Sequence, residues 1–470
     1  MIRKNKDPSN DIAGFYETVN VNETGTSSDS LLLIKHGASE FSSSQKGSLR
    51  WIALFFICFS NFGPYFCFDN PQPLQNTIET QFQITTYQYN LLYTLYSLPN
   101  IVLALVGGLF IDKIGIRISM MFFSFLTIIG QVFVTLGAAH LSFPGLLVGR
   151  LLFGIGEESL IVGLHTMIAK WFKGKELAFA FGINLTVSRL SSSCNSFFTP
   201  RIYEWSGQVL AMPFIIGTIL NCGSFICCLS LCYVDRKNDA SKENSEEISK
   251  KDHKISLKDF KSFTLLYYLL LINCGLLYGA YFGLSNNLND MMLKRFGFNS
   301  KSAGSLILII YISSAIINPL FGFFIDKIGK RGKFILVSAG ICFFTHFLLL
   351  VLHDGTELSP NYGVIGALLA KGLFISILSP VFWPCISLVV DKKATGTAYG
   401  IVGSMVNLAI ASVPLVFGAI HDATKDSHAG YFWPEVLLLI LASVSIFVTT
   451  LICIVDKKTG GELEKIHKKE

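Results

Sequence analysis

The sequence predicts an all-helical membrane protein with twelve transmembrane helices in two six-helix halves. Three observations predict this fold: an apolar composition, apolar runs long enough to cross a bilayer, and a short motif that occurs once in each half. Of 470 residues, 51% are hydrophobic and only 15% are charged, against about 25% charged residues in soluble domains. The mean hydropathy is +0.51. This composition does not fit a soluble enzyme, a disordered chain, a disulfide scaffold or a nucleic-acid-binding domain.

Apolar runs of roughly 20 residues, long enough to cross a hydrocarbon core of about 30 Å, recur from Trp51 onward. The predicted transmembrane helices are 51–68, 90–111, 118–138, 143–169, 176–198, 207–233, 264–286, 303–325, 334–352, 362–388, 395–420 and 431–455. Several contain proline, such as Pro99 and Pro384, which membrane helices tolerate when neighbouring groups satisfy the freed backbone.

Lysine and arginine are divided unequally between the two sides of this topology. If the N-terminus lies in the cytoplasm, the cytoplasmic segments hold 30 of the 38 basic residues and the opposite loops hold five. The excess of basic residues on the cytoplasmic side therefore predicts that both termini lie there. The predicted organisation is a cytoplasmic tail (1–48), a six-helix bundle (49–233), a charged cytoplasmic linker (234–263), a second six-helix bundle (264–455) and a cytoplasmic tail (456–470).

The motif G-x-x-I-D-K-I-G-x-R occurs at residues 108–117 and again at 322–331, between the second and third helices of each half. An acid at a helix end attracts cations and neighbouring helix N-termini, and contacts of this kind can break and re-form as two halves rock about a central site. We therefore expect Asp112, Arg117, Asp326 and Arg331 to act in gating. Two such loops in a twelve-helix chain resemble the signature of the major facilitator superfamily.

Further motifs resemble one branch of that superfamily, the lysosomal dipeptide transporters that work beside a heavily glycosylated accessory membrane protein. The motifs are FCFDNP at 66–71, YSLPN at 96–100, FGIGEESL at 153–160, WFKGKEL at 171–177 and GTAYG at 396–400. The resemblance implies a dipeptide substrate, a lysosomal membrane and possession of that partner. The chain departs from the branch at Glu157, where glycine is expected, and at Lys371, where an apolar residue is expected.

Ionisable groups deep in a bilayer are costly and usually functional, and Glu158 and Arg189 are the leading pair here. Each lies 13 residues from the loop that joins the fourth and fifth helices, so each is about 20 Å from that loop at a rise of 1.5 Å per residue. One interpretation is a structural ion pair. The other is a substrate site in which Arg189 grips a carboxylate and Glu158 receives an ammonium group, which is the assignment that the resemblance carries to these two positions.

Lys371 is a third candidate for substrate binding, because the repeat places it near the position equivalent to Glu157 and Glu158. The alternative is a lysine that snorkels to the interface. Glu157 either lines the site or pairs with Arg150 or Lys371. Arg150 lies near the outer end of its helix and is expected to be structural or gating.

Aromatic and amide side chains near these charges are expected to shape the pocket, although each also fits ordinary packing. Trp383 beside Pro384 is the first of them, since its ring edge donates a hydrogen bond. His165 and His346 are expected to be packing residues. The other candidates for the lining are Tyr65, Tyr93, Tyr278 and Asn407.

The chain shows no Walker motif that would couple transport to ATP, and its eleven cysteines lack metal-ligand spacing. No cofactor or nucleic-acid partner is expected. In the N-terminal tail, Asp29, Leu33 and Ile34 resemble a dileucine sorting signal for lysosomes.

These observations predict a transporter, not an enzyme, that moves short zwitterionic peptides from the lysosome to the cytoplasm by alternating access, as a uniporter. Uniport is favoured because few buried acids are available to carry a proton. One alternative is a proton-coupled carrier of amino acids, organic anions or sugars. Another is a non-transporting sensor or scaffold, and the plasma membrane is the alternative location.

Overall fold

The computed structural model describes residues 49–103, 114–172, 175–240, 263–391, 395–425 and 428–465. The chain divides into two compact units, Met1–Ile52 and Ala53–Glu470. In the first unit the described residues, 49–52, are helical; the rest of this account concerns the second. The predicted sorting signal at Asp29, Leu33 and Ile34, the loop that contains Asp112, and most of the linker lie outside the described residues.

Each of the twelve predicted ranges falls on helix within the part of the chain that the structure describes. A helix at 53–69 leads into the short η1 (Gln72–Leu74) and α3 (Gln75–Phe82), which the sequence did not predict. The others are α4 (Thr86–Ser97), α6 (Ile116–Ala139), α7 (Phe143–Trp171), α8 (Lys175–Trp205), α9 (Ala211–Ala240), α10 (Leu265–Lys294), α11 (Ser300–Ile328), α12 (Arg331–Val351), α13 (Val364–Val389), α14 (Thr395–Ala423) and α15 (Phe432–Lys458).

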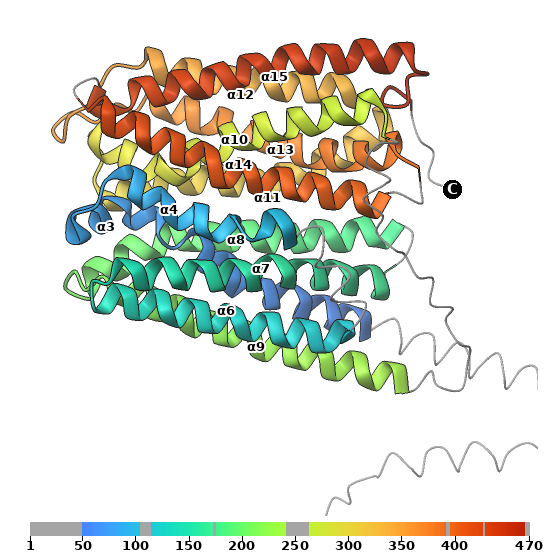
Figure 1. Cartoon of the computed structure of the whole chain (residues 1–470), viewed down its shortest axis with the longest axis horizontal. Helices are drawn as coiled ribbons and strands as arrows, with labels where there is room; N and C mark the ends of the chain where they lie inside the picture. The colour runs from blue at the N-terminus through green and yellow to red at the C-terminus, as the bar shows by residue number, and fades with distance from the viewer. Residues whose placement is uncertain are drawn as a thin grey trace, which may run out of the picture. The chain divides into compact units, whose positions relative to one another are not determined.

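The helices pack in two sets (Figure 1). In the first set, α6 packs on α7 and α9, and α4 packs on α7; in the second set, α10 packs on α14 and α15, and α13 packs on α11 and α12. The helix pairs α8 with α11 and α4 with α14 make most of the contacts between the sets, and η1 and α3 also contact α10. The term "first set" below means the helices from 53 to 240, and "second set" means those from 265 to 458.

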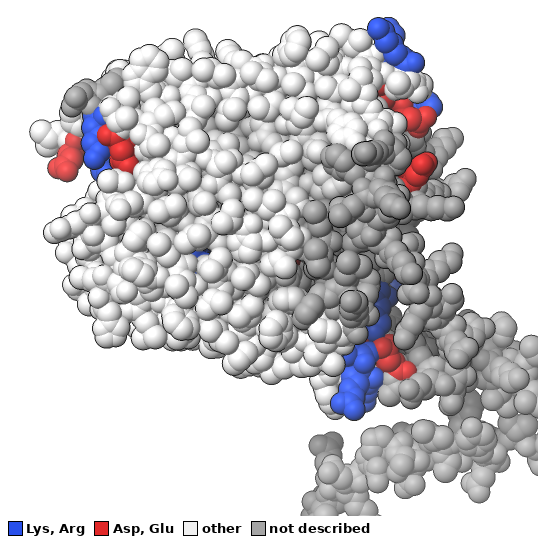
Figure 2. Space-filling model, in the orientation of Figure 1, with Lys and Arg blue, Asp and Glu red and all other residues white. Residues whose placement is uncertain are grey.

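Apolar side chains cover the outside of the helices. On the face in Figure 2, the charged side chains of the described residues gather at the two ends, and the broad zone between them is almost entirely uncharged. Phe122, Phe125 and Phe133 of α6 are exposed, as are Phe344 of α12 and Phe447 of α15. Nine helices among the described residues are long and apolar enough to cross a membrane. Such a surface suits hydrocarbon rather than water.

The second predicted helix, 90–111, is broken at Pro99. Helix α4 ends at Ser97, residues 98 and 99 form a turn, and helix resumes at Asn100. Proline removes a backbone donor and its ring clashes with the preceding turn. The Asn100 side chain compensates by donating to the carbonyl oxygens of Tyr96 at 2.9 Å and of Gly154, on α7, at 3.0 Å.

Several helices also run past their predicted ends, and α10 does so by the most residues. Helix α10 continues eight residues past 286, because the polar side chains between Ser285 and Asp290 are buried inside the protein and not exposed in a loop. The segment after α15 also packs on the protein: Leu463 is fully buried, and its carbonyl oxygen accepts a hydrogen bond from the backbone nitrogen of Arg331 at 2.8 Å.

Candidate functional site

Ionisable side chains lie inside the bundle, away from its charged ends. Arg150 and Glu157 are 1% exposed and Lys371 is 3% exposed. Glu158 and Arg189 are half-buried. Helices α7, α8 and α13 supply these residues, so both sets contribute.

Glu158 contacts both sets of helices. The Tyr96 hydroxyl, on α4, donates to Glu158 Oε1 at 3.4 Å. The Asn407 side chain, on α14, lies beside the same carboxylate, and its Nδ2 donates to the Gly403 carbonyl oxygen at 3.1 Å. Glu158 therefore lies at the junction between the sets, with neutral side chains of α4 and α14 beside it.

Arg189 also bridges the sets. Its guanidinium lies near Tyr65 and Asp69 of the first set and near Tyr281 and Tyr311 of the second. The Tyr281 side chain lies beside it. Phenol groups from α10 and α11 thus face an arginine from α8.

Glu158 and Arg189 form no ion pair with each other within the described part of the chain. Both instead act on the phenol group of Tyr65, which Glu157 and Asp69 also reach. Among the described residues neither side chain forms an ion pair, so each can take the opposite charge of a ligand, although Asp69 also lies near Arg189. The structural ion pair considered above is absent from this conformation.

Asp69 belongs to this cluster, although sequence reasoning missed it. It ends the first helix, is 9% exposed, and interacts with the Ser192 side chain and with the arginines Arg150 and Arg189. An acid at the end of an apolar run is ordinary in a membrane helix, so the sequence alone does not single it out. The signal that could have found it is the PQP sequence at 71–73, which turns the chain inward into η1.

Arg150 connects helices of the first set. It donates to the backbone carbonyl oxygens of Leu92 at 3.4 Å and Cys67 at 3.3 Å. Its guanidinium also lies 5.1 Å from the Tyr93 ring centre and 5.2 Å from that of Tyr96. These contacts fit the structural role expected for Arg150, and Tyr93 serves mainly as part of this aromatic cage.

Glu157 is buried beside these groups. It interacts with the Tyr96 side chain and electrostatically with Arg150. Its Oε2 has no hydrogen-bond partner among the residues that the structure describes. Among the described residues it forms no ion pair with Arg150 or Lys371.

Two aromatic candidates lie together in the second set. Trp383 Nε1 donates to the Tyr278 hydroxyl at 3.1 Å, and the Trp383 ring stacks on Tyr399 with centroids 6.2 Å apart. Tyr278 in turn lies within electrostatic reach of Arg189. Trp383 and Tyr278 thus form an aromatic wall near the charges.

Lys371 does not reach across to the first set. Its Nζ donates to the backbone carbonyl oxygen of Tyr281 at 2.9 Å and lies 4.5 Å from the centre of that ring. The ionisable groups that act on it are Cys342 and Glu435, which belong to its own set. It is neither snorkelling to an interface nor facing Glu157.

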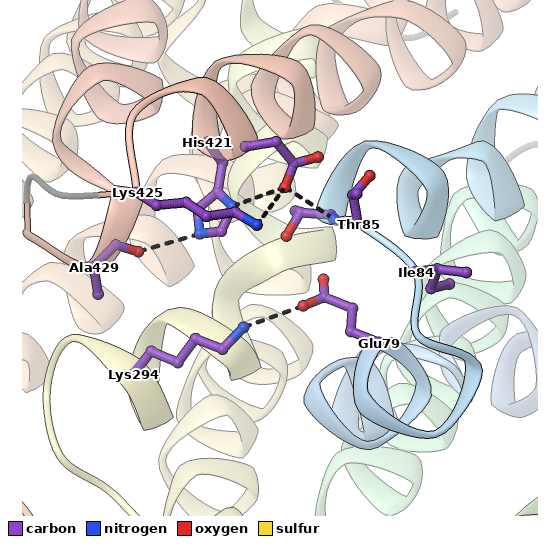
Figure 3. A pocket seen from close by; sticks show the side chains of 9 residues that line it. Glu79, Ile84, Thr85, Lys294, His421, Lys425 and Ala429 are labelled. Atoms are coloured by element: carbon purple, nitrogen blue, oxygen red, sulfur yellow. Dashed lines mark hydrogen bonds and ion pairs between the residues drawn. The ribbon is translucent and has the colours of Figure 1, made fainter.

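The sets are bonded together at the end that carries α3. Asp422, on α14, accepts backbone N–H groups of Thr86 at 3.1 Å and Tyr87 at 2.8 Å in the first turn of α4. Lys294 Nζ, on α10, lies 3.1 Å from Glu79 Oε2 on α3. Figure 3 shows the Lys294–Glu79 contact at a pocket of about 450 Å³, whose lining comes from both sets and includes Asp422 and Thr86.

Neutral amide contacts lie deeper than this pocket. Gln75 Nε2 donates to Asn287 Oδ1 at 3.1 Å, and Asn90 Nδ2 donates to the same oxygen at 3.0 Å. Gln72 Nε2 donates to the Ser285 carbonyl oxygen at 2.6 Å. We call these contacts, together with those of Asp422 and Lys294, the α3-end closure.

At the opposite end, the ion pairs between described residues stay within one set. Arg117 Nε lies 2.6 Å from Asp235 Oδ2, and Lys170 Nζ lies 2.7 Å from the same oxygen, all in the first set. In the second set Lys333 lies 3.6 Å from Glu464. Arg331 is 6% exposed, and the side chain of Asp326 lies outside the described residues. The described ion pairs therefore link the sets at the α3 end and not at the other.

Two bundles that meet around buried charges, with polar contacts closing one end, define a secondary membrane transporter rather than an enzyme. The Major Facilitator Superfamily model matches residues 51–414 and 272–467. The chain belongs to this superfamily.

Curated relatives support the same assignment. The chain is 34% identical over 423 residues to "Lysosomal dipeptide transporter MFSD1" of Mus musculus, covering 88% of each chain. It is 32% identical over 422 residues to the protein of that name in Danio rerio, again covering 88% of each. It is also 22% identical to "Choline/ethanolamine transporter FLVCR1" of Felis catus, over 81% of this chain and 68% of that protein.

Solved structures share the fold. A point mutant of the nucleoside transporter NupG aligns with a TM-score of 0.67 at 12% identity, over 85% of this chain and 99% of that one. A bacterial homologue of the human lysosomal transporter Spinster, described as inward-facing and unoccupied, aligns with a TM-score of 0.65 at 13% identity, over 88% and 98%. At these identities the likeness concerns the fold alone.

Proposed function

We propose that this chain carries dipeptides out of the lysosome into the cytoplasm by alternating access, as a uniporter. The observation that carries the proposal is the pair of charges, Glu158 and Arg189, that lie around Tyr65 at the junction of the sets and form no ion pair among the described residues. Relatives at 30–34% identity that are named lysosomal dipeptide transporters support both the substrate and the location.

In this proposal, Arg189 binds the peptide carboxylate and Glu158 the amino terminus. The planar guanidinium of arginine offers two parallel donors to a carboxylate. Glu158 keeps lone pairs for an ammonium group because the side chains beside it, Tyr96 and Asn407, are neutral. Recognition of the charged ends leaves the peptide side chains to Trp383, Tyr278 and the surrounding tyrosines, so we expect loose side-chain specificity.

The α3-end closure gives the direction of release in the observed conformation. If the termini are cytoplasmic, as the distribution of basic residues predicts, the α3 end faces the lumen. The proposed state is then closed to the lumen and releases its ligand to the cytoplasm. Transport returns the site to the lumen by breaking the contacts of Asp422, Lys294 and the amides.

Uniport is proposed because the buried acids have other partners. Glu158 and Glu157 contact Tyr96, and Asp69 lies between two arginines and Ser192. A glycosylated accessory membrane protein remains part of the proposal on the strength of the sequence resemblance alone.

The test is uptake of a labelled dipeptide into proteoliposomes, with and without a pH gradient. We expect saturable uptake without a gradient. Arg189→Ala and Glu158→Gln should each raise KM by about tenfold or more, since each removes a charge-assisted contact worth about 1.5–3 kcal/mol. The exposed arginine Arg236 on α9 supplies a matched control, Arg236→Gln, which should leave KM unchanged.

Other outcomes would favour the alternatives. Uptake only with a gradient would indicate a proton symporter. An Arg189-dependent flux that tolerates Glu158→Gln would indicate an anion carrier. Ligand binding without flux, in protein shown to be folded, would indicate a sensor or scaffold.

A further inference from the structure

Lys371 is a buried cation whose nearest partner is a backbone group. It is 3% exposed in the first third of α13, and its Nζ donates to the Tyr281 carbonyl oxygen at 2.9 Å. Within the described residues no carboxylate lies within ion-pair distance of it. A charge held in the interior without such a partner is expensive, so its position calls for a function.

The position of Lys371 fixes Tyr281 at two points. Besides the bond to the carbonyl oxygen, the ammonium group lies 4.5 Å from the centre of the Tyr281 ring, within the range of a cation–π attraction. The Ser285 hydroxyl donates to the same carbonyl oxygen at 2.7 Å. The Phe374 ring, from the same helix as Lys371, lies 6.4 Å from the Tyr281 ring.

The Tyr281 side chain is the contact that the second set makes with Arg189. The Tyr281 phenol lies beside that guanidinium across the junction, close enough for the two to bind one carboxylate. Tyr281 therefore links a buried lysine on one side to the carboxylate-binding arginine on the other.

Lys371 already has a counter-charge nearby. Glu435, on α15, acts on it electrostatically. Glu435 is itself fixed, because its Oε2 lies 2.8 Å from His346 Nδ1 on α12, and both side chains are buried. The ammonium group of Lys371 thus does not depend on a ligand carboxylate to balance it.

We propose that Lys371 is a positioning residue for the peptide carboxylate, which holds Tyr281 so that its hydroxyl and Arg189 meet that carboxylate together. The proposal rests on the dipeptide function given above. It replaces the expectation that Lys371 itself contacts the ligand. It also adds Tyr281 to the residues that bind the carboxylate.

The test is a double-mutant cycle on dipeptide uptake in proteoliposomes. Lys371→Met keeps an apolar stem and removes the donor and the charge; we expect it to raise KM by about tenfold and to leave the maximal rate within about twofold. Tyr281→Phe should raise KM similarly. If Lys371 acts through the Tyr281 hydroxyl, then Lys371→Met should change KM by less than about twofold in the Tyr281→Phe protein.

Three controls separate positioning from general damage. Lys371→Gln keeps a donor for the Tyr281 carbonyl and should bind dipeptide more tightly than Lys371→Met. Tyr267, also on α10, bonds through its hydroxyl to the Ala398 carbonyl oxygen at 3.0 Å, so Tyr267→Phe should combine additively with Lys371→Met. Inhibition by a C-terminally amidated dipeptide, which lacks the carboxylate, should not change in Lys371→Met.

The proposal is overturned by any of three results in folded protein: a wild-type KM in Lys371→Met, additive effects of Lys371→Met and Tyr281→Phe, or equal affinities for the Gln and Met variants. Absence of dipeptide uptake by the wild type would instead refute the proposed function. Size-exclusion profiles and melting temperatures establish that each variant is folded.

Discussion

The closure of the α3 end depends strongly on Asp422. Its carboxylate accepts two N–H groups at the N-terminus of α4, at 3.1 and 2.8 Å, and its side chain is 18% exposed. At this position the carboxylate caps the helix and complements its dipole. In Asp422→Asn one neutral oxygen remains as an acceptor. Replacing two charge-assisted bonds by one neutral bond costs about 1.5–2 kcal/mol, so the ratio of open to closed protein should rise about 10- to 30-fold.

Thiol labelling measures this ratio. Ser285, 6% exposed beneath the closure, can be changed to cysteine with little change in size, and its alkylation by a membrane-impermeant maleimide from the α3 side requires opening. We expect labelling to accelerate about 10- to 30-fold in the Asp422→Asn protein. The matched control is Lys425→Gln, because Lys425 lies 3.9 Å from Asp422 with its side chain 60% exposed. Such an exposed pair contributes little. Equal rates in the Asp422→Asn and parent proteins would refute the reasoning.

Two further predictions concern stability. The first concerns Asp354, in the loop after α12. Burial alone would raise the pKa of its carboxyl, but hydrogen bonds from His428 and Arg295 outweigh burial and hold that pKa below its ordinary 3.8. A lowered pKa stabilises the folded state only while the acid is ionised. The decrease in melting temperature caused by Asp354→Asn should therefore be the same at pH 7 and pH 5, and it should become smaller below about pH 4. A decrease that is already smaller at pH 5 than at pH 7 would contradict this. The second concerns Gly154. In Gly154→Ala, the new Cβ would lie 2.2 Å from the Tyr96 carbonyl oxygen where α4 and α7 meet, so α4 must move. We expect overpacking to cost about 1–3 kcal/mol and to lower the melting temperature by several degrees; an unchanged melting temperature would show that the two helices do not approach each other tightly.

Hydropathy predicted the helices well because each helix must cover a hydrocarbon thickness with apolar residues, a requirement that acts locally along the chain. Hydropathy failed at Pro99, because a break in a membrane helix depends on whether a neighbouring helix can bond the backbone groups that the break leaves free. Asn100 provides that support by bonding to α7, 54 residues away.

The site was predicted in part for the same reason. Glu158 and Arg189 stood out as charges within apolar runs, and their helices bring both of them to Tyr65. Most of their partners could not be predicted. Asn407 is a lining candidate in the sequence, but Tyr281 and Tyr311 come from the other set and no periodicity links them to α8. Asp69 was not predicted because an acid at the end of an apolar run is ordinary, although the chain there turns inward.

The α3-end closure relies on neutral amides as well as charges. The bonds of Gln72, Gln75 and Asn90 to the second set carry no net charge and are buried, whereas the Glu79–Lys294 pair is partly exposed. Dissolved ions screen exposed charges over about 10 Å at 0.1 M but have little effect on buried dipoles. The balance between the two orientations of the carrier is therefore buffered against changes in the ionic strength of the compartment it faces.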